Sequence, residues 1–331
     1  MTISSIFAKV LWPTAGLSLT WRKILIRQLF NGFITPNFQF STVFFGLKYE
    51  GNLNNNIEAN ILFYGAFEKP LLFFLRDCWN ALQSEGCENH KTAFIDIGAN
   101  IGQHSLFMSN LADQVVAFEP FSEVSNKLKH HISLNKLKNI KLEQIALSDR
   151  EEMLDFYAPT GRNQGIGSFD ASTTDKGNMA FNKLELIRGD SYFGKHSYSI
   201  RFIKIDVEGF EKKVIAGMNE TLSSQRPLIV CEVSYGNDIA FTDEKDLLAH
   251  LPEDYLLFRF DTRNSVGAKA KKRGSRAKRT GLYRIVPVKD WRASGQDDII
   301  AVPAEKKTLI PGLNAESVSY THLTLPTNRE V

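Results

Sequence analysis

The amino-acid sequence predicts an α/β fold, in which helices cover both faces of a mostly parallel sheet. Two observations lead to this prediction. Short apolar runs of strand length alternate with segments of helical periodicity, which is the pattern of strand–helix–strand units. The chain has 331 residues, of which 43% are hydrophobic, so it can form one large domain with extensions.

The alternation can be followed from residue 92 onward. Each apolar run is short, most of the runs end in glycine, proline or an acid, and the helical segments between them have apolar residues at helical spacing. The expected strands are 92–98, 114–120, 140–147, 153–159, 200–206 and 227–233, and the clearest helices are 102–112, 122–137 and 209–218. Two further runs, 255–262 and 297–303, have no helical pattern between them, so we expect them to pair antiparallel.

The chain is expected to have three parts. Residues 1–65 form a small N-terminal extension of helix and strand, in which 17–30 is either a helix packed on the domain or an amphipathic helix at a membrane surface. Residues 66–303 form the main domain, with a basic loop at 263–280. Residues 304–331 form a disordered tail, and its last part, 318–331, resembles a translated sequencing adapter.

Composition excludes several classes of protein. The net charge is +3, so no global field points to nucleic acid or to an anionic membrane. The three cysteines have no metal-ligand spacing and suit a reducing compartment, so we expect a cytoplasmic protein. No uninterrupted apolar stretch is long enough for a transmembrane helix. Nothing in the sequence indicates an oligomeric state.

The first predicted strand ends in a glycine-containing loop, DIGANIG, at residues 96–102. Asp96, Gly98, Asn100 and Gly102 lie at the carboxyl end of the strand, where open α/β sheets bind ligands. A dinucleotide loop would have glycine where Asn100 stands, so a pyrophosphate fits poorly. Glu119 ends the next strand and could accept both ribose hydroxyls. This combination favours a nucleoside without a diphosphate, such as S-adenosylmethionine.

Two acids end the run IRFIKIDVEG at residues 200–209. If the strand continues, Asp206 and Glu208 point to the same side while Ile205 and Val207 point to the other. Such a pair could accept a proton from a hydroxyl, or hold a divalent metal ion such as Mg²⁺ that lowers the hydroxyl's pKa. Alternatively, Asp206 caps the following helix and Glu208 lies in its first turn.

Six segments together resemble the FkbM family of S-adenosylmethionine-dependent methyltransferases. They are FIDIGANIGQHS, VVAFEP, LNKLKNIKLEQIALSD, GIGSFD, IRFIKIDVEGFEKKVIAGM and RPLIVCEV, and they occur in the family's order and spacing from about residue 65 to 233. The resemblance implies a Rossmann-like class I fold with a seven-stranded sheet, mostly parallel, whose last strand is antiparallel. The implied activity is methylation of a hydroxyl on a sugar, glycan or secondary metabolite.

The resemblance also implies a role for individual residues. The loop would hold the methionine part of the cofactor, Glu119 and Pro120 its ribose, and the ALSD segment its adenine, while Asp206 and Glu208 would face the reacting methyl group. The implied cofactor-binding residues are therefore Asp96, Gly98, Ala99, Asn100, Gly102, Glu119, Pro120, Ala146, Ser148 and Asp149.

Other candidates have weaker support. Glu232 could border the acceptor pocket or form a salt bridge, His104 could bind the cofactor's carboxylate or be a packed histidine, and Ser168 lies in a glycine-rich loop that could close over the site. The run 269–279 carries seven positive charges, so it is either a solvated loop or a handle for an anionic partner. The alternatives to a methyltransferase are a nicotinamide-dependent enzyme and an inactive binding protein that docks through this run.

Overall fold

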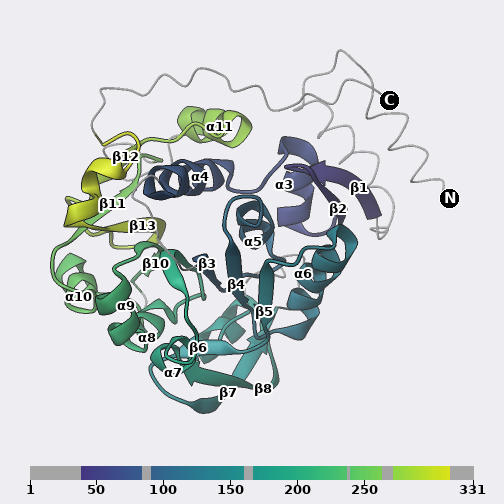
Figure 1. Cartoon of the computed structure of the whole chain (residues 1–331). Helices are drawn as coiled ribbons and strands as arrows, with labels where there is room; N and C mark the ends of the chain where they lie inside the picture. The colour runs from purple at the N-terminus through teal and green to yellow at the C-terminus, as the bar shows by residue number, and fades with distance from the viewer. Residues whose placement is uncertain (1–38, 84–90, 160–166, 237–238, 263–270, 314–331) are drawn as a thin grey trace.

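The computed structural model describes residues 39–83, 91–159, 167–236, 239–262 and 271–313 (Figure 1). It confirms the α/β fold. The main sheet has the strand order β12-β11-β13-β10-β9-β3-β4-β5, and its central pairs are parallel. Its strands are β3 (Thr92–Ile97), β4 (Gln114–Phe118), β5 (Ile140–Glu143), β9 (Ser199–Ile205), β10 (Leu228–Tyr235), β11 (Tyr255–Phe260), β12 (Ile285–Pro287) and β13 (Gly295–Pro303).

The last strand of the main sheet, β13, is antiparallel to both of its neighbours, β10 and β11. This confirms the expected antiparallel last strand and the pairing of the runs 255–262 and 297–303. The sheet has eight strands in place of the expected seven, because the three-residue strand β12 pairs with β11 at the edge.

Every residue of the central strand β3 is buried, as expected for a parallel strand covered on both faces. Alternate residues enter two different cores: Phe94 packs in one, while Ala93 and Ile95 pack in the other. Leucines and aromatic residues of α4 (Lys69–Gln83) and α5 (Gln103–Met108) cover the first face. The second face is covered by α7 (Gly189–Phe193), α8 (Glu211–Ala216), α9 (Asn219–Gln225) and α10 (Glu244–Ala249).

A second, three-stranded sheet lies below the carboxyl ends of the main strands in Figure 1. Its order is β6-β8-β7, with strands β6 (Ala146–Ser148), β7 (Glu152–Ala158) and β8 (Met179–Arg188). The run 140–147, expected as one strand, is divided between β5 and β6. The division occurs because the half-buried residues of β5 pair with β4, whereas the fully buried residues of β6 pair with β8.

The described part of the N-terminal extension is a hairpin and a helix. The hairpin consists of β1 (Gln39–Phe44) and β2 (Leu47–Asn52), and α3 (Asn56–Tyr64) follows. The hairpin packs on α6 (Ser122–Asn135), where the ring of Tyr49 stacks on His131 with 4.3 Å between centroids. The segment 17–30 lies outside the described residues.

The C-terminal part of the chain differs from expectation in two places. Residues 271–280 of the expected basic loop form a helix, α11 (Lys271–Thr280), which packs against α4. Residues 304–309 form a 3-10 helix, η2 (Ala304–Leu309), and Ile310 is buried in the core, so the tail does not begin at residue 304. Residues 314–331 lie outside the described residues. Each helix in the described part of the chain is too short or too polar to cross a bilayer.

Candidate active site

The loop after β3 lies across the end of β4. The backbone N–H groups of Gly98 and Ala99 both donate to the carbonyl oxygen of Phe118, at 3.0 and 2.9 Å. The next N–H group, that of Asn100, donates to Oε2 of Glu119 at 2.9 Å. Gly98 and Asn100 both have positive φ angles, 78° and 53°, which a glycine and an asparagine adopt more readily than other residues. The loop and Glu119 are thus held as one unit.

Glu119 has the properties of a hydroxyl-binding carboxylate. Its second oxygen, Oε1, accepts a hydrogen bond from the N–H group of Phe121 at 3.0 Å. Burial raises the pKa of Glu119 to about 7, although the two backbone hydrogen bonds oppose this shift. Each carboxylate oxygen can accept a second hydrogen bond, so both remain able to bind a ligand's hydroxyl groups.

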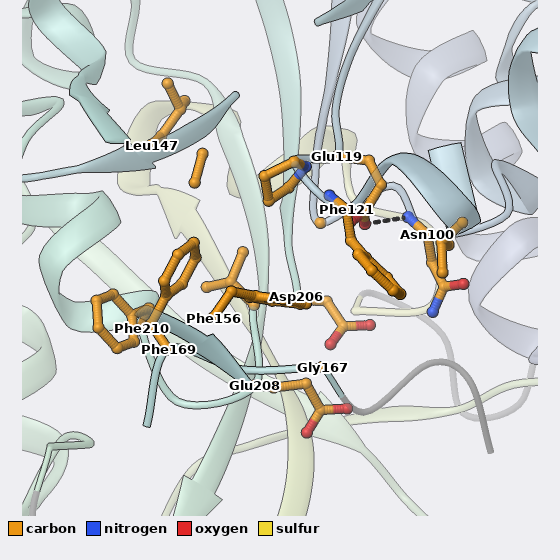
Figure 2. Close-up of a pocket in the computed structure, with 15 residues that line it drawn as sticks. Asn100, Glu119, Phe121, Leu147, Phe156, Gly167, Phe169, Asp206, Glu208 and Phe210 are labelled. Carbon is orange, nitrogen blue, oxygen red and sulfur yellow. Dashed lines mark hydrogen bonds between the residues drawn. The ribbon is translucent and has the colours of Figure 1, made fainter. Parts of the chain in front are cut away.

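A pocket opens between this loop, the start of α6 and the turn after β9. Seven of the predicted site residues line it, namely Gly98, Asn100, Glu119, Pro120, Ala146, Asp206 and Glu208. Its other wall is aromatic: the rings of Phe121, Phe156, Phe169 and Phe210 follow one another, with 5.2 to 5.3 Å between successive centroids. Figure 2 shows three of these rings gathered on one side of the pocket, away from the carboxylates of Asp206 and Glu208.

The other predicted cofactor residues do not line this pocket. Gly102 is needed for packing, because a Cβ atom there would lie 2.3 Å from a methyl carbon of Leu128. Ser148 is buried, and its carbonyl oxygen contacts Gly217, which follows α8. The Ser148 hydroxyl donates a hydrogen bond to Asp149. Asp149 in turn is paired with Arg150. Ala99 is buried in the core.

Asp96 lies beneath the pocket and is fully buried. Its Oδ2 accepts a hydrogen bond from Ser105 at 2.6 Å. Its Oδ1 has no hydrogen-bond partner among the described residues and lies 4.0 Å from the ammonium of Lys204. Asp96 therefore pairs with Lys204 below the site.

Lys204 connects Asp96 to Asp206. The lysine ammonium is buried and lies 3.1 Å from Oδ2 of Asp206. Burial favours the neutral form of Asp206, but the charge of Lys204 and hydrogen bonds from Glu232 and Lys204 hold its pKa below the ordinary value. Sequence reasoning missed Lys204, although a lysine two residues before Asp206 in a strand lies on the same face and is a signal.

Asp206 and Glu208 come together by a turn, not by strand alternation. Strand β9 ends at Ile205, Glu208 has a φ of 51°, and Val207 lines the same pocket. The expectation that Val207 points away is therefore wrong. The carboxylates nevertheless approach each other, because the turn places both at the mouth of the pocket.

The capping alternative for Asp206 and Glu208 is also wrong. Helix α8 begins at Glu211, and its N-cap residue, Phe210, makes no side-chain cap within the described structure. Instead, Oε1 of Glu211 accepts hydrogen bonds from the N–H groups of Val207 and Gly209, at 3.0 and 3.1 Å. Glu211 thus stabilises the turn, while Asp206 and Glu208 line the pocket.

Glu232 joins the two acids from β10. Oxygen atoms of Asp206, Glu208 and Glu232 all lie within 4.8 Å of one another, a spacing that could admit a cation. Burial and the negative charges of Asp206 and Asp298 raise the pKa of Glu232 well above its usual value. Asp298 of β13 lies opposite Glu232 in the antiparallel register of β10 and β13, and it is not among the predicted residues. The ammonium of Lys204 supplies one positive charge at Asp206.

Ser168 lies in the described part of the glycine-rich loop, whose residues 163–166 fall outside the described structure. Its hydroxyl donates to the carbonyl oxygen of Glu208 at 2.9 Å and accepts from the N–H group of Asp170 at 3.1 Å. Its neighbours Gly167 and Phe169 line the pocket. The loop therefore contacts both the pocket and the turn that carries the acids.

Comparison with known proteins agrees with this geometry. Residues 96–260 match the methyltransferase FkbM domain, from the aspartate of the first loop to the end of β11. The chain belongs to the FkbM methyltransferase family. FkbM proteins are S-adenosylmethionine-dependent methyltransferases, and the expectation drawn from the six sequence segments is confirmed.

Individual relatives are distant. AMB antimetabolite synthetase AmbE of Pseudomonas aeruginosa is 27% identical over 192 residues, covering 47% of this chain but only 9% of the synthetase. The crystal structure of methyltransferase FkbM from Methylobacillus flagellatus is 13% identical with a TM-score of 0.38, covering 64% of this chain and 43% of that one. The crystal structure of M. jannaschii TYW2 in complex with AdoMet is 9% identical with a TM-score of 0.35, covering 81% of this chain and 87% of that one.

Proposed function

We propose that this FkbM protein transfers the methyl group of S-adenosylmethionine to a hydroxyl group of a small-molecule or glycan acceptor. The observation that carries the proposal is the position of Asp206 and Glu208, which line the same pocket as the loop of Gly98 and Asn100. Carboxylates beside a cofactor loop can take the proton that a hydroxyl must lose.

The pocket suits the adenosine part of the cofactor. Glu119 offers carboxylate oxygens for the two ribose hydroxyls, and the rings of Phe121, Phe156 and Phe169 form an apolar wall on which a purine can pack. When bound, S-adenosylmethionine supplies an electrophilic methyl group on sulfur. The protein's part is to align the acceptor and to exclude water.

The two acids have different environments, and we assign them different roles. Asp206 is ionised and held by Lys204, and its lowered pKa makes it a weak proton acceptor but a good hydrogen-bond partner for orienting a hydroxyl. Glu208 extends from the turn into the pocket, where its carboxylate accepts the proton (Figure 2).

Substitution of the two acids tests this assignment. Glu208→Gln should lower methyl transfer by about 100-fold or more, the typical effect of losing a general base. Asp206→Asn should also lower it, because the acceptor hydroxyl loses the group that orients it. Affinity for S-adenosylmethionine should stay within about threefold for Glu208→Gln. The measurement is transfer of a labelled methyl group to metabolites or glycans of a cell extract, followed by calorimetry with the cofactor.

The same assay separates direct proton transfer from metal assistance. Full activity in the presence of a chelator supports proton acceptance by Glu208, whereas a loss that Mg²⁺ restores supports an ion between Asp206, Glu208 and Glu232. If both variants transfer methyl groups at the normal rate, the acids have no role in the reaction.

A further inference from the structure

Glu68 is an acid of the site that neither the motifs nor the pocket identifies. Glu68 lies just before α4. Its pKa rises to about 8, chiefly because of burial and then because of the negative charges of Asp298, Asp206 and Glu208. The positive charge of Lys204 opposes this rise. Lys204 already contacts Asp206. This end of the sheet therefore carries more negative than positive charge.

The backbone on both sides of Glu68 is fixed. The side-chain amide of Gln103, on α5, accepts a hydrogen bond from the N–H group of Phe67 at 2.6 Å and donates to the carbonyl oxygen of Phe67 at 2.9 Å. The carbonyl oxygen of Glu68 accepts hydrogen bonds from the N–H groups of Leu71 and Leu72 at the start of α4. Glu68 itself has a φ of 45°, a conformation that persists only where the surroundings enforce it.

This arrangement places Glu68 beside His104, the residue that follows Gln103. Nε2 of His104 lies 3.7 Å from Oε2 of Glu68, which is too long for a hydrogen bond. The histidine is 7% exposed, and its Nε2 has no hydrogen-bond partner among the described residues. Burial, and then the charge of Lys204, lower the pKa of His104 well below its usual value, so the imidazole is neutral.

The carboxyl group of Glu68 and the lone pair of a neutral imidazole form a site for a cationic N–H donor, whose positive charge favours the ionised form of Glu68. Such a site offers a carboxylate no positive charge, which argues against the expectation that His104 binds the carboxyl group of the cofactor. We propose that Glu68 and His104 bind the α-ammonium group of the methionine part of S-adenosylmethionine. The proposal rests on the proposed function, since it assigns the far end of the same cofactor.

The test uses product analogues that differ only in this part of the molecule. S-adenosylhomocysteine keeps the α-ammonium group without the charged sulfur, its desamino analogue lacks that group, and 5′-methylthioadenosine lacks the whole amino-acid tail. Affinities are measured by calorimetry for the wild type, for Glu68→Gln, for His104→Asn and for Glu253→Gln, which removes the same charge from an exposed loop.

Glu68→Gln should weaken S-adenosylhomocysteine binding by about tenfold or more, the effect of losing a hydrogen bond between charged groups. It should leave the affinity for the desamino analogue and 5′-methylthioadenosine unchanged. His104→Asn should act in the same direction, and Glu253→Gln should have no effect.

Two results would overturn the inference alone: unchanged S-adenosylhomocysteine binding by Glu68→Gln, or equal weakening of all three ligands. Absence of S-adenosylhomocysteine binding to the wild type would overturn both the inference and the cofactor assignment.

Discussion

At the scale of single residues, the site depends on how each carboxylate is held. Glu119 accepts hydrogen bonds from two backbone N–H groups, and Asp206 contacts the buried ammonium of Lys204. Glu211 accepts hydrogen bonds from the backbone of the turn after β9. The partners leave each acid with a different capacity. Glu119 keeps lone pairs for hydroxyl groups, and Asp206 stays ionised in a half-buried position beside the ammonium of Lys204. An acid's role here follows from its partners more than from its position in a motif.

Glu119 gives a prediction about pH. Because its pKa is about 7, the carboxylate gains a proton as the pH falls below 7 and loses its charge-assisted hydrogen bonds to ribose. Affinity for 5′-methylthioadenosine, which has no amine that titrates in this range, should fall by about tenfold between pH 8 and pH 6. Calorimetry across this range measures it.

Glu119→Gln is the control for this pH dependence. Its affinity should be lower than that of the wild type at pH 8 and nearly constant with pH. An equally steep pH dependence in this variant would show that another group is titrating.

At the scale of elements, loops at the carboxyl ends of strands meet and brace one another. The Ser168 hydroxyl links the glycine-rich loop to the backbone of Glu208, while the loop after β3 is fastened to Glu119. The close approach of Gly98 to the carbonyl oxygen of Asp206, where a Cβ atom would lie at 1.8 Å, joins the cofactor loop to the acidic turn. These contacts fix the position of the loop after β3 relative to the turn that carries Asp206 and Glu208.

Ser168→Ala should therefore affect transfer more than cofactor binding. Loss of the Ser168 hydroxyl leaves the half-buried carbonyl oxygen of Glu208 without this donor. We expect methyl transfer to fall by about tenfold while affinity for S-adenosylmethionine changes less than threefold. Thr174→Ala removes an exposed hydroxyl from the neighbouring 3-10 helix η1 (Ala171–Lys176) and should leave both quantities unchanged. Equal losses of transfer and of affinity in Ser168→Ala would indicate a general disturbance of the fold.

The sequence predicted much of this arrangement, because strand ends can be recognised locally. Gly98, Asn100, Glu119 and Asp206 each follow an apolar run, and parallel strands bring such positions to one edge of a sheet. Glu68 could not be found in this way, since it precedes a helix and reaches the site only through packing against α5. Ser148 and Gly102 were assigned to the cofactor, but their positions follow from packing against α8 and α6.

At the scale of the whole molecule, the basic helix and the pocket lie at opposite ends. Figure 1 places α11 beside α4, away from the three-stranded sheet that borders the pocket. One of its lysines, Lys278, lies over the ring of Tyr64 at 4.7 Å from the centroid. An inactive protein that docks an anionic partner through 269–279 would use a surface separate from the pocket. Binding of such a partner and methyl transfer can therefore be measured independently.

We propose that this pocket binds S-adenosylmethionine and not a dinucleotide. The most direct measurement is a calorimetric titration of the wild-type protein with S-adenosylmethionine and, separately, with NAD. We predict one S-adenosylmethionine bound per chain and no heat of binding with NAD. Binding of NAD in the absence of any S-adenosylmethionine binding would show that the pocket belongs to a different class of enzyme.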